Sequence, residues 1–138
     1  MSQENVDVVR AAYDAFNRRD LDALWPLLDP ECEVDLANSM GFDRSKYSGR
    51  EGVLKFFESY WDSFDSITIE VEECIEGRDA VVVVIRAIGR GLGSGVEVDA
   101  RGPHAWSFRG GRVVSVGLHE HLEDALDVAG LSDAQRRS

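Results

Sequence analysis

The residues best suited to chemistry lie in the stretch His104-Ala105-Trp106-Ser107-Phe108. Alternation of this kind predicts a β-strand with His104, Trp106 and Phe108 on one face. An imidazole can donate a hydrogen bond to a substrate oxygen or move a proton near neutral pH, and aromatic surroundings lower its pKa through desolvation. The alternative is a core histidine that is hydrogen-bonded to its neighbours and supports no turnover. His104 is the first candidate for a catalytic or ligand-binding group.

Two further groups are candidates for assisting His104. Strand alternation places Glu120 on the same face as Val116 and Leu118, where its carboxylate and the imidazole would form an acid/base pair. The alternative for Glu120 is a solvated carboxylate at a strand end. Tyr13 offers a hydroxyl from the first predicted helix, and its alternative is a packed ring with a wet tip.

Two histidines near the C-terminus have the spacing of metal ligands. His119 and His121 are two residues apart, so one strand face would present both imidazoles. Alternation puts that face opposite Val116 and Leu118 and away from His104. Because the sequence offers no evident third ligand, no metal site is expected.

Charged residues on the predicted strands form a second possible constellation. Asp99 and Arg101 are two residues apart and could pair directly, on the face opposite His104. An ion pair at a dimer surface is the plainer interpretation of that spacing. Arg86 has no assigned partner, and Glu70 or Glu72 across the sheet is the candidate.

Composition limits the classes of function. The chain of 138 residues is expected to form one domain over residues 1–131 with a polar tail over 132–138. A net charge of -11 argues against nucleic acid and against acidic membrane surfaces. Cys32 and Cys74 are too few for a disulfide framework and are expected to be buried free thiols. The N-terminal residues lack the layout of a signal peptide, so a cytoplasmic location is expected.

Helical spacing of apolar residues predicts a first helix over residues 4–18. Asp20 is a good N-cap for a short second helix, in which Pro26 should cause a kink or an irregular turn. A third helix opens at Gly49 with an aromatic stripe, and a last short helix follows over residues 122–129.

Alternating patterns predict a sheet after the helices. A short strand over 33–36 is followed by a polar loop over 38–48, and the later strands are expected over 67–71, 80–88, 96–108 and 113–118. The glycine-rich stretch 89–95 precedes another strand instead of a helix, so a phosphate-binding role is not expected. Neither this stretch nor any other predicts a cofactor. The order of elements predicts an α+β layout.

Several segments, in this order, resemble those of the SnoaL-like group of the nuclear transport factor 2-like, or ketosteroid isomerase-like, superfamily. They are Asn17 to Leu24, Leu28 to Pro30, Gly49 to Val53, Trp106 to Val114 and Glu123 to Leu131. The resemblance implies a cone-shaped barrel, in which a curved, mostly antiparallel sheet wraps around the N-terminal helices. It also implies a pocket between helices and sheet, and a homodimer through the outer sheet face.

Members of this superfamily include ketosteroid isomerases, polyketide cyclases, limonene epoxide hydrolases and proteins without known activity. By resemblance, the isomerase base position falls on Leu36, its tyrosine on Ala12, and its protonated acid donor on His104. The cyclase histidine and aspartate positions fall on Val116 and Leu118. The chain therefore departs from both arrangements, and only His104 retains a polar group.

The expected ligand is a small lipophilic molecule in an apolar pocket. The side chains expected to line this pocket are Phe16, Trp25, Phe57, Tyr60, Trp61, Trp106, Phe108, Val116 and Leu118. One hypothesis is an isomerase, cyclase or lyase that uses His104 as proton shuttle or carbonyl polariser, assisted by Glu120 or Tyr13. The alternatives are a non-catalytic binding or dimerisation module, and an epoxide-hydrolase-like activation of water near Asp99 and Arg101.

Overall fold

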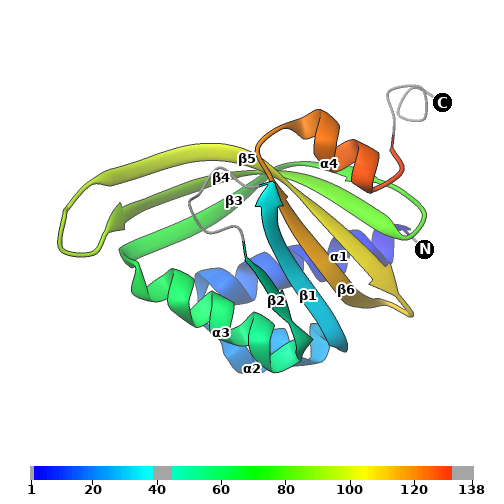
Figure 1. The fold of residues 1–138 in the computed structure, drawn as a ribbon, viewed down its shortest axis with the longest axis horizontal. Coiled ribbons are helices and arrows are strands. Elements are labelled where there is room, and N and C mark those ends of the chain that lie inside the picture. Colours follow the sequence, from blue (N-terminus) through cyan, green and yellow to red (C-terminus); the bar gives the residue numbers. More distant parts are fainter. Residues whose placement is uncertain (1, 39–44, 132–138) are drawn as a thin grey trace.

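A computed structural model describes residues 2–38 and 45–131 of the chain. Its helical segments are α1 (Ser2–Asn17), α2 (Leu21–Leu24), the 3₁₀ turn η1 (Trp25–Leu27), α3 (Gly49–Asp62) and α4 (Leu122–Val128). Its strands are β1 (Leu28–Asn38), β2 (Lys46–Ser48), β3 (Phe64–Glu76), β4 (Ala80–Gly91), β5 (Glu97–Arg109) and β6 (Arg112–His119) (Figure 1).

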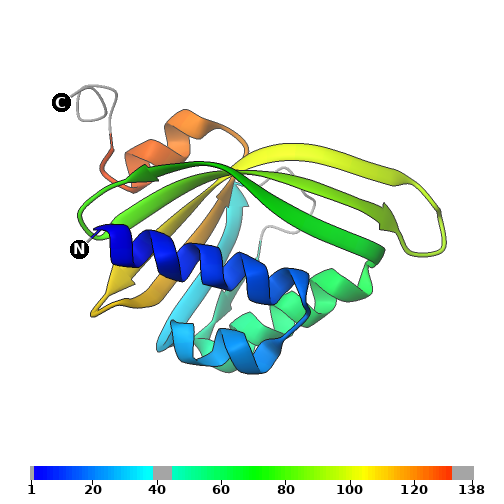
Figure 2. The ribbon, with the colours of Figure 1, turned by 180° about the vertical axis from the view of Figure 1, so that it is seen from behind.

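In the described part of the chain these strands form one six-stranded sheet in the order β2-β1-β6-β5-β4-β3. The pairing of β1 with β6 is parallel, and every other neighbouring pair is antiparallel. Helix α1 packs on β3 and β4, and α3 packs on β1. Figures 1 and 2 show α4 on the opposite side of the sheet. The predicted α+β class, with N-terminal helices on a mostly antiparallel sheet, is confirmed.

The N-terminal helices form for the reasons that the sequence suggests. In α1 the predicted apolar stripe is buried, with Val9 fully inaccessible to solvent. Asp20 caps α2, because its side chain accepts a hydrogen bond from the Ala23 backbone N–H at 3.1 Å. Pro26 lies in the η1 turn, where the helix becomes irregular as predicted. Helix α3 begins at Gly49 and α4 begins at Leu122, both where expected.

The strand prediction near residue 33 was too short, and a second strand nearby was not predicted. Strand β1 begins at Leu28 instead of residue 33, because Leu28 pairs with Val113 of β6. Strand β2 lies within the predicted polar loop and pairs with residues 33–35 of β1. These strands depend on partners distant in sequence, which local alternation does not reveal. Part of the predicted loop, residues 39–44, and the predicted tail over 132–138 lie outside the described residues.

The register of the sheet decides which side chains face the helices. His104 pairs with Val83 of β4, and Trp106 pairs with Val81, so all four side chains share the face covered by α1 and α3. The opposite face is covered at one end by α4, which packs on β4, β5 and β6. Among the described helices, none is both long and apolar enough to cross a membrane.

Candidate ligand-binding site

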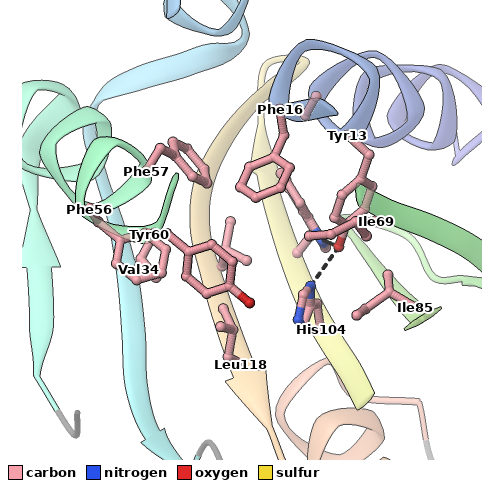
Figure 3. A pocket seen from close by; sticks show the side chains of 13 residues that line it. Tyr13, Phe16, Val34, Phe56, Phe57, Tyr60, Ile69, Ile85, His104 and Leu118 are labelled. Atoms are coloured by element: carbon pink, nitrogen blue, oxygen red, sulfur yellow. Dashed lines mark hydrogen bonds between the residues drawn. The ribbon is translucent and has the colours of Figure 1, made fainter. Parts of the chain in front are cut away.

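The helix-covered face of the sheet encloses an apolar cavity of about 60 Å³. Its walls come from α1, α3 and the strands of the sheet, as Figure 3 shows. The lining side chains are mainly aromatic and aliphatic: Ala12, Tyr13, Phe16, Val34, Phe56, Phe57, Tyr60, Ile69, Ile85, His104, Trp106, Val116 and Leu118. We call this space the inner chamber.

A wider cavity of about 360 Å³ adjoins the inner chamber, and we call it the vestibule. The two spaces share five lining residues, namely Phe56, Tyr60, Ile85, His104 and Leu118. The vestibule extends between the C-terminal half of α3 and the β4–β5 hairpin, where Ser59, Ser63 and Ala87 contribute to its wall. His104 therefore lies at the junction, in contact with both spaces.

A chain of hydrogen bonds holds His104 in place. The Tyr13 hydroxyl oxygen is 2.7 Å from His104 Nδ1, and Trp106 Nε1 donates to the same oxygen at 3.0 Å. The Tyr13 ring also packs edge-on against Trp106 and is stacked with His104. Because Tyr13 and Trp106 are both buried, this chain fixes the imidazole against a rigid wall.

Burial determines the ionisation of these groups. Desolvation, followed by the nearby His119, lowers the pKa of His104 to about 4. Desolvation also raises the pKa of Tyr13 far above its usual range and raises the pKa of Tyr60. At neutral pH the imidazole and both phenols are therefore uncharged.

Tyr60 provides a second polar group at the cavity. Figure 3 shows its hydroxyl directed from α3 toward the space between Leu118 and His104. Among the described residues, this hydroxyl has no hydrogen-bond partner. The sequence offered Tyr60 as a lining residue, and the structure adds that its polar end is available to a ligand.

Charged groups are nearly absent from the described lining. No carboxylate lines either space, and Arg101 of the vestibule uses its guanidinium to pair with Glu72 at 2.9 Å. Leu36, at the isomerase base position by resemblance, lines the vestibule with an apolar side chain. The arrangement can orient a ligand and polarise an oxygen atom, but the described lining provides no strong base.

The structure brings most of the predicted lining residues together, but not all of them. Phe16, Phe57, Tyr60, Trp106, Val116 and Leu118 line the inner chamber beside Tyr13 and His104.

Trp25, Trp61 and Phe108 do not line either space, which corrects the prediction. Trp25 is 41% exposed, with the Arg50 guanidinium 4.4 Å from its ring centre. Trp61 and Phe108 are buried in the core. Strand alternation gave Phe108 the correct face, but it lies too far along β5 to reach the cavity.

The prediction for Glu120 was also wrong. Its side chain is 51% exposed, and its carboxylate lies 3.9 Å from the His121 imidazole at the surface. Strand β6 ends at His119, so the alternation that placed Glu120 beside Val116 and Leu118 no longer applies. It forms no acid/base pair with His104.

The two C-terminal histidines are separated for the same reason. His121 is the exposed N-cap residue of α4, whereas His119 is buried on the strand. A Cβ atom on Gly117 would lie 2.9 Å from His119 Nε2, so this ring covers Gly117 on the face opposite Leu118. Within residues 2–38 and 45–131, neither His119 nitrogen has a hydrogen-bond partner. The described residues contain no cluster suited to a metal ion.

Asp99 and Arg101 do not pair with each other. Asp99 pairs with Arg86 at 2.7 Å, and Arg101 pairs with Glu72. Arg86 therefore has a partner that sequence reasoning missed, diagonally across the β4–β5 ladder, where Asp99 itself lies opposite Ile88. Both cysteines are free, as predicted, but only Cys32 is buried, whereas Cys74 is partly exposed.

Several lining residues were missed from the sequence, among them Val34, Phe56, Ile69 and Ile85. Ile69 and Ile85 lie on strands whose inward faces carry many similar apolar residues. Only the strand register shows that they reach the cavity, because Val83, next but one to Ile85 along β4, pairs with His104. Alternation within each strand indicates which face of the sheet a side chain occupies, but it does not show whether that side chain reaches the cavity.

Comparison with known proteins agrees with this architecture. A model of the SnoaL-like domain matches residues 9–116, so the chain belongs to the SnoaL-like domain family. The comparison with curated proteins gave no match.

Solved structures share the fold at low sequence identity. A nuclear transport factor 2-like protein of unknown function from Burkholderia pseudomallei is 23% identical, with a TM-score of 0.76 over 91% of this chain and 97% of that chain. TerC, co-crystallised with polyporic acid, is 19% identical, with a TM-score of 0.75 over 92% and 98%. A Mycobacterium tuberculosis protein in complex with estradiol-17β-hemisuccinate is 16% identical, with a TM-score of 0.73 over 86% and 95%.

Proposed function

We propose that the inner chamber and the vestibule form one binding site for a small lipophilic molecule, whose oxygen atom is held by His104. The observation that carries this proposal is the position of His104, a polar side chain at the junction of the apolar inner chamber and the wider vestibule. Pockets with apolar walls and a few fixed polar groups are typical of small-molecule sites. Together the two spaces are large enough for a compact bicyclic molecule.

The part of the ligand beside His104 should be uncharged. The described lining places no free cation there, and a neutral imidazole does not offset the cost of burying an anion. The net charge of -11 also disfavours the approach of anions. Two structural neighbours were solved with small molecules, polyporic acid and estradiol-17β-hemisuccinate, which supports this general use of the fold.

Binding can be tested with two matched compounds, 1-indanone and indane, which differ by one carbonyl oxygen. Backbone NMR shifts should saturate with 1-indanone and should centre on Tyr13, Tyr60 and His104. We expect His104→Leu to weaken 1-indanone binding by about three- to tenfold, the effect of one lost hydrogen bond, and to leave indane unchanged. Equal loss for both compounds, or no saturable binding, would contradict the proposal.

A second candidate is catalysis of the isomerase, cyclase or lyase type. The hydrogen-bonded chain of Trp106, Tyr13 and His104 favours it, because such a chain can polarise a carbonyl group. Exchange of deuterium into the carbon beside the 1-indanone carbonyl would report enolisation. Exchange that is faster with the protein than with His104→Leu supports catalysis, and no acceleration supports a binding module.

We also propose a homodimer through the outer sheet face beyond α4. Ile88, which is 38% exposed, lies on this face among alternating acidic and basic side chains. A self-complementary surface of this kind is typical of two-fold interfaces. Sedimentation should show a dimer that Ile88→Asp weakens, and an unchanged monomer in both proteins would contradict the assembly.

A further inference from the structure

We infer that Trp106 and Tyr13 are positioning residues that fix His104 as a hydrogen-bond donor toward the cavity, so that the site selects ligands with an acceptor oxygen. The expected ligand selectivity rests on the proposed function, which this inference makes more specific. It also distinguishes between the two roles open to His104, a carbonyl polariser and a proton shuttle.

The argument starts from the hydrogens available to the three side chains. An indole N–H only donates, so the Tyr13 oxygen must accept the bond from Trp106. The Tyr13 hydroxyl has one hydrogen of its own to donate. Its second hydrogen-bond partner is His104 Nδ1, 2.7 Å from the hydroxyl oxygen. Tyr13 is 5% exposed, and a buried hydroxyl hydrogen without an acceptor is costly. The arrangement that satisfies all three groups has Tyr13 donating to His104 Nδ1.

This arrangement determines the tautomer of the imidazole. A neutral ring that accepts at Nδ1 carries its hydrogen on Nε2. Figure 3 shows the second ring nitrogen of His104 directed away from Tyr13. No described residue forms a hydrogen bond to Nε2. His104 therefore presents its Nε2–H group at the junction of the two cavities. This donor binds ketone, aldehyde, ester or ether oxygens and disfavours a ligand that places its own N–H there.

The same chain opposes proton transfer. If His104 gave its Nε2 hydrogen to a ligand oxygen, Nδ1 would have to take the Tyr13 hydrogen and leave a buried phenolate. Burial raises the pKa of Tyr13 far above its usual range, which disfavours that phenolate strongly. His104 thus polarises a carbonyl while its own N–H bond stays intact.

The tautomer can be measured in the ligand-free protein by ¹⁵N NMR of the histidine rings at neutral pH. We expect His104 Nδ1 to have the shift of an unprotonated nitrogen and Nε2 that of a protonated one. The Trp106→Phe variant removes the indole donor but keeps an aromatic ring, which frees one side of the Tyr13 oxygen. The population of the Nδ1–H tautomer should then rise. A protonated Nδ1 in the unsubstituted protein would overturn the inference.

Tyr60→Phe is the matched control, because it removes a hydroxyl from the cavity and leaves the chain of Trp106, Tyr13 and His104 intact. Tyr60→Phe should leave the His104 tautomer unchanged. If Trp106 had a purely structural role, the Trp106→Phe variant would also leave the tautomer unchanged. Tyr13→Phe gives a second variant that breaks the chain, in case Trp106→Phe folds poorly. An unchanged tautomer in both variants of the chain would contradict a positioning role.

Selectivity is tested with 1-indanone, which only accepts a hydrogen bond, and indole, which only donates one. The protein should bind 1-indanone about tenfold more tightly, and the ratio should fall in Trp106→Phe. Equal binding of the two compounds by the unsubstituted protein would overturn the selectivity. If neither compound binds, the proposed function fails, whereas the NMR measurement still decides whether the chain fixes the tautomer.

Discussion

The two faces of the sheet differ in how their polar side chains are paired and solvated. On the inner face His104 is held by Tyr13 at the inner chamber, whose described lining carries no charged group. On the outer face Arg86 and Asp99 form an ion pair that water can reach. His119, whose ring covers Gly117 on the outer face, is buried without a hydrogen-bond partner in the described part of the chain. A well-defined donor therefore depends on a neutral hydrogen-bonded chain, such as that of Trp106, Tyr13 and His104 on the inner face.

The largest expected difference between the faces is a pH dependence that comes from His104. Its pKa of about 4 in the folded protein compares with 6.5 for a free histidine, so the unfolded chain binds more protons between these values. The free energy of unfolding should fall by about 3 kcal/mol as the pH drops through this window.

The His104→Gln variant isolates this effect, because glutamine can still accept a hydrogen bond from Tyr13 but does not titrate. Urea unfolding of both proteins from pH 7.5 to 4 gives the comparison, and the carboxylates contribute equally to each. Parallel stability curves for the two proteins would show that His104 is not desolvated as described.

A smaller effect should separate the half-buried His104 from the buried His119. His104→Leu leaves the Tyr13 hydroxyl without its acceptor and should lower the free energy of unfolding by about 1–3 kcal/mol. His119→Leu removes two nitrogens for which the described residues provide no hydrogen-bond partner, so it should leave stability unchanged or raise it. Urea unfolding at pH 7.5 measures both variants. Equal destabilisation by the two substitutions would contradict the proposed difference between the two faces of the sheet.

The smallest effect is expected at the outer ion pairs. Asp99→Asn should change stability very little, because the pair with Arg86 is solvent-accessible and water replaces it. Any difference should shrink as salt is added. Thermal unfolding at low and high salt is the measurement, with Arg101→Gln as the control at the neighbouring pair. If Asp99→Asn lowered the free energy of unfolding as much as His104→Leu, this face would be buried in an assembly.

Much of the fold could be predicted from the sequence, because it depends on local patterns. Alternation along the chain gave the shared face of His104 and Trp106, and helical spacing gave the buried stripe of α1. The contact between Tyr13 and His104 joins residues 91 positions apart, and no local pattern contains it.

The errors have physical causes as well. Alternation was extended past the end of β6, which placed Glu120 in the cavity although the chain had already turned toward α4. Trp25 and Trp61 were assigned to the pocket by residue type alone, whereas their positions on η1 and α3 direct them elsewhere. The partner of Arg86 required the register between β4 and β5, which the sequence does not show.

The central claim is that His104 presents an N–H group to a neutral ligand at the junction of the inner chamber and the vestibule. A crystal structure of the protein with bound 1-indanone tests it most directly. The account predicts the ketone oxygen at about 2.9 Å from His104 Nε2, with the rings packed among the aromatic side chains. A ketone oxygen directed away from His104, or a ligand bound outside both cavities, would contradict it.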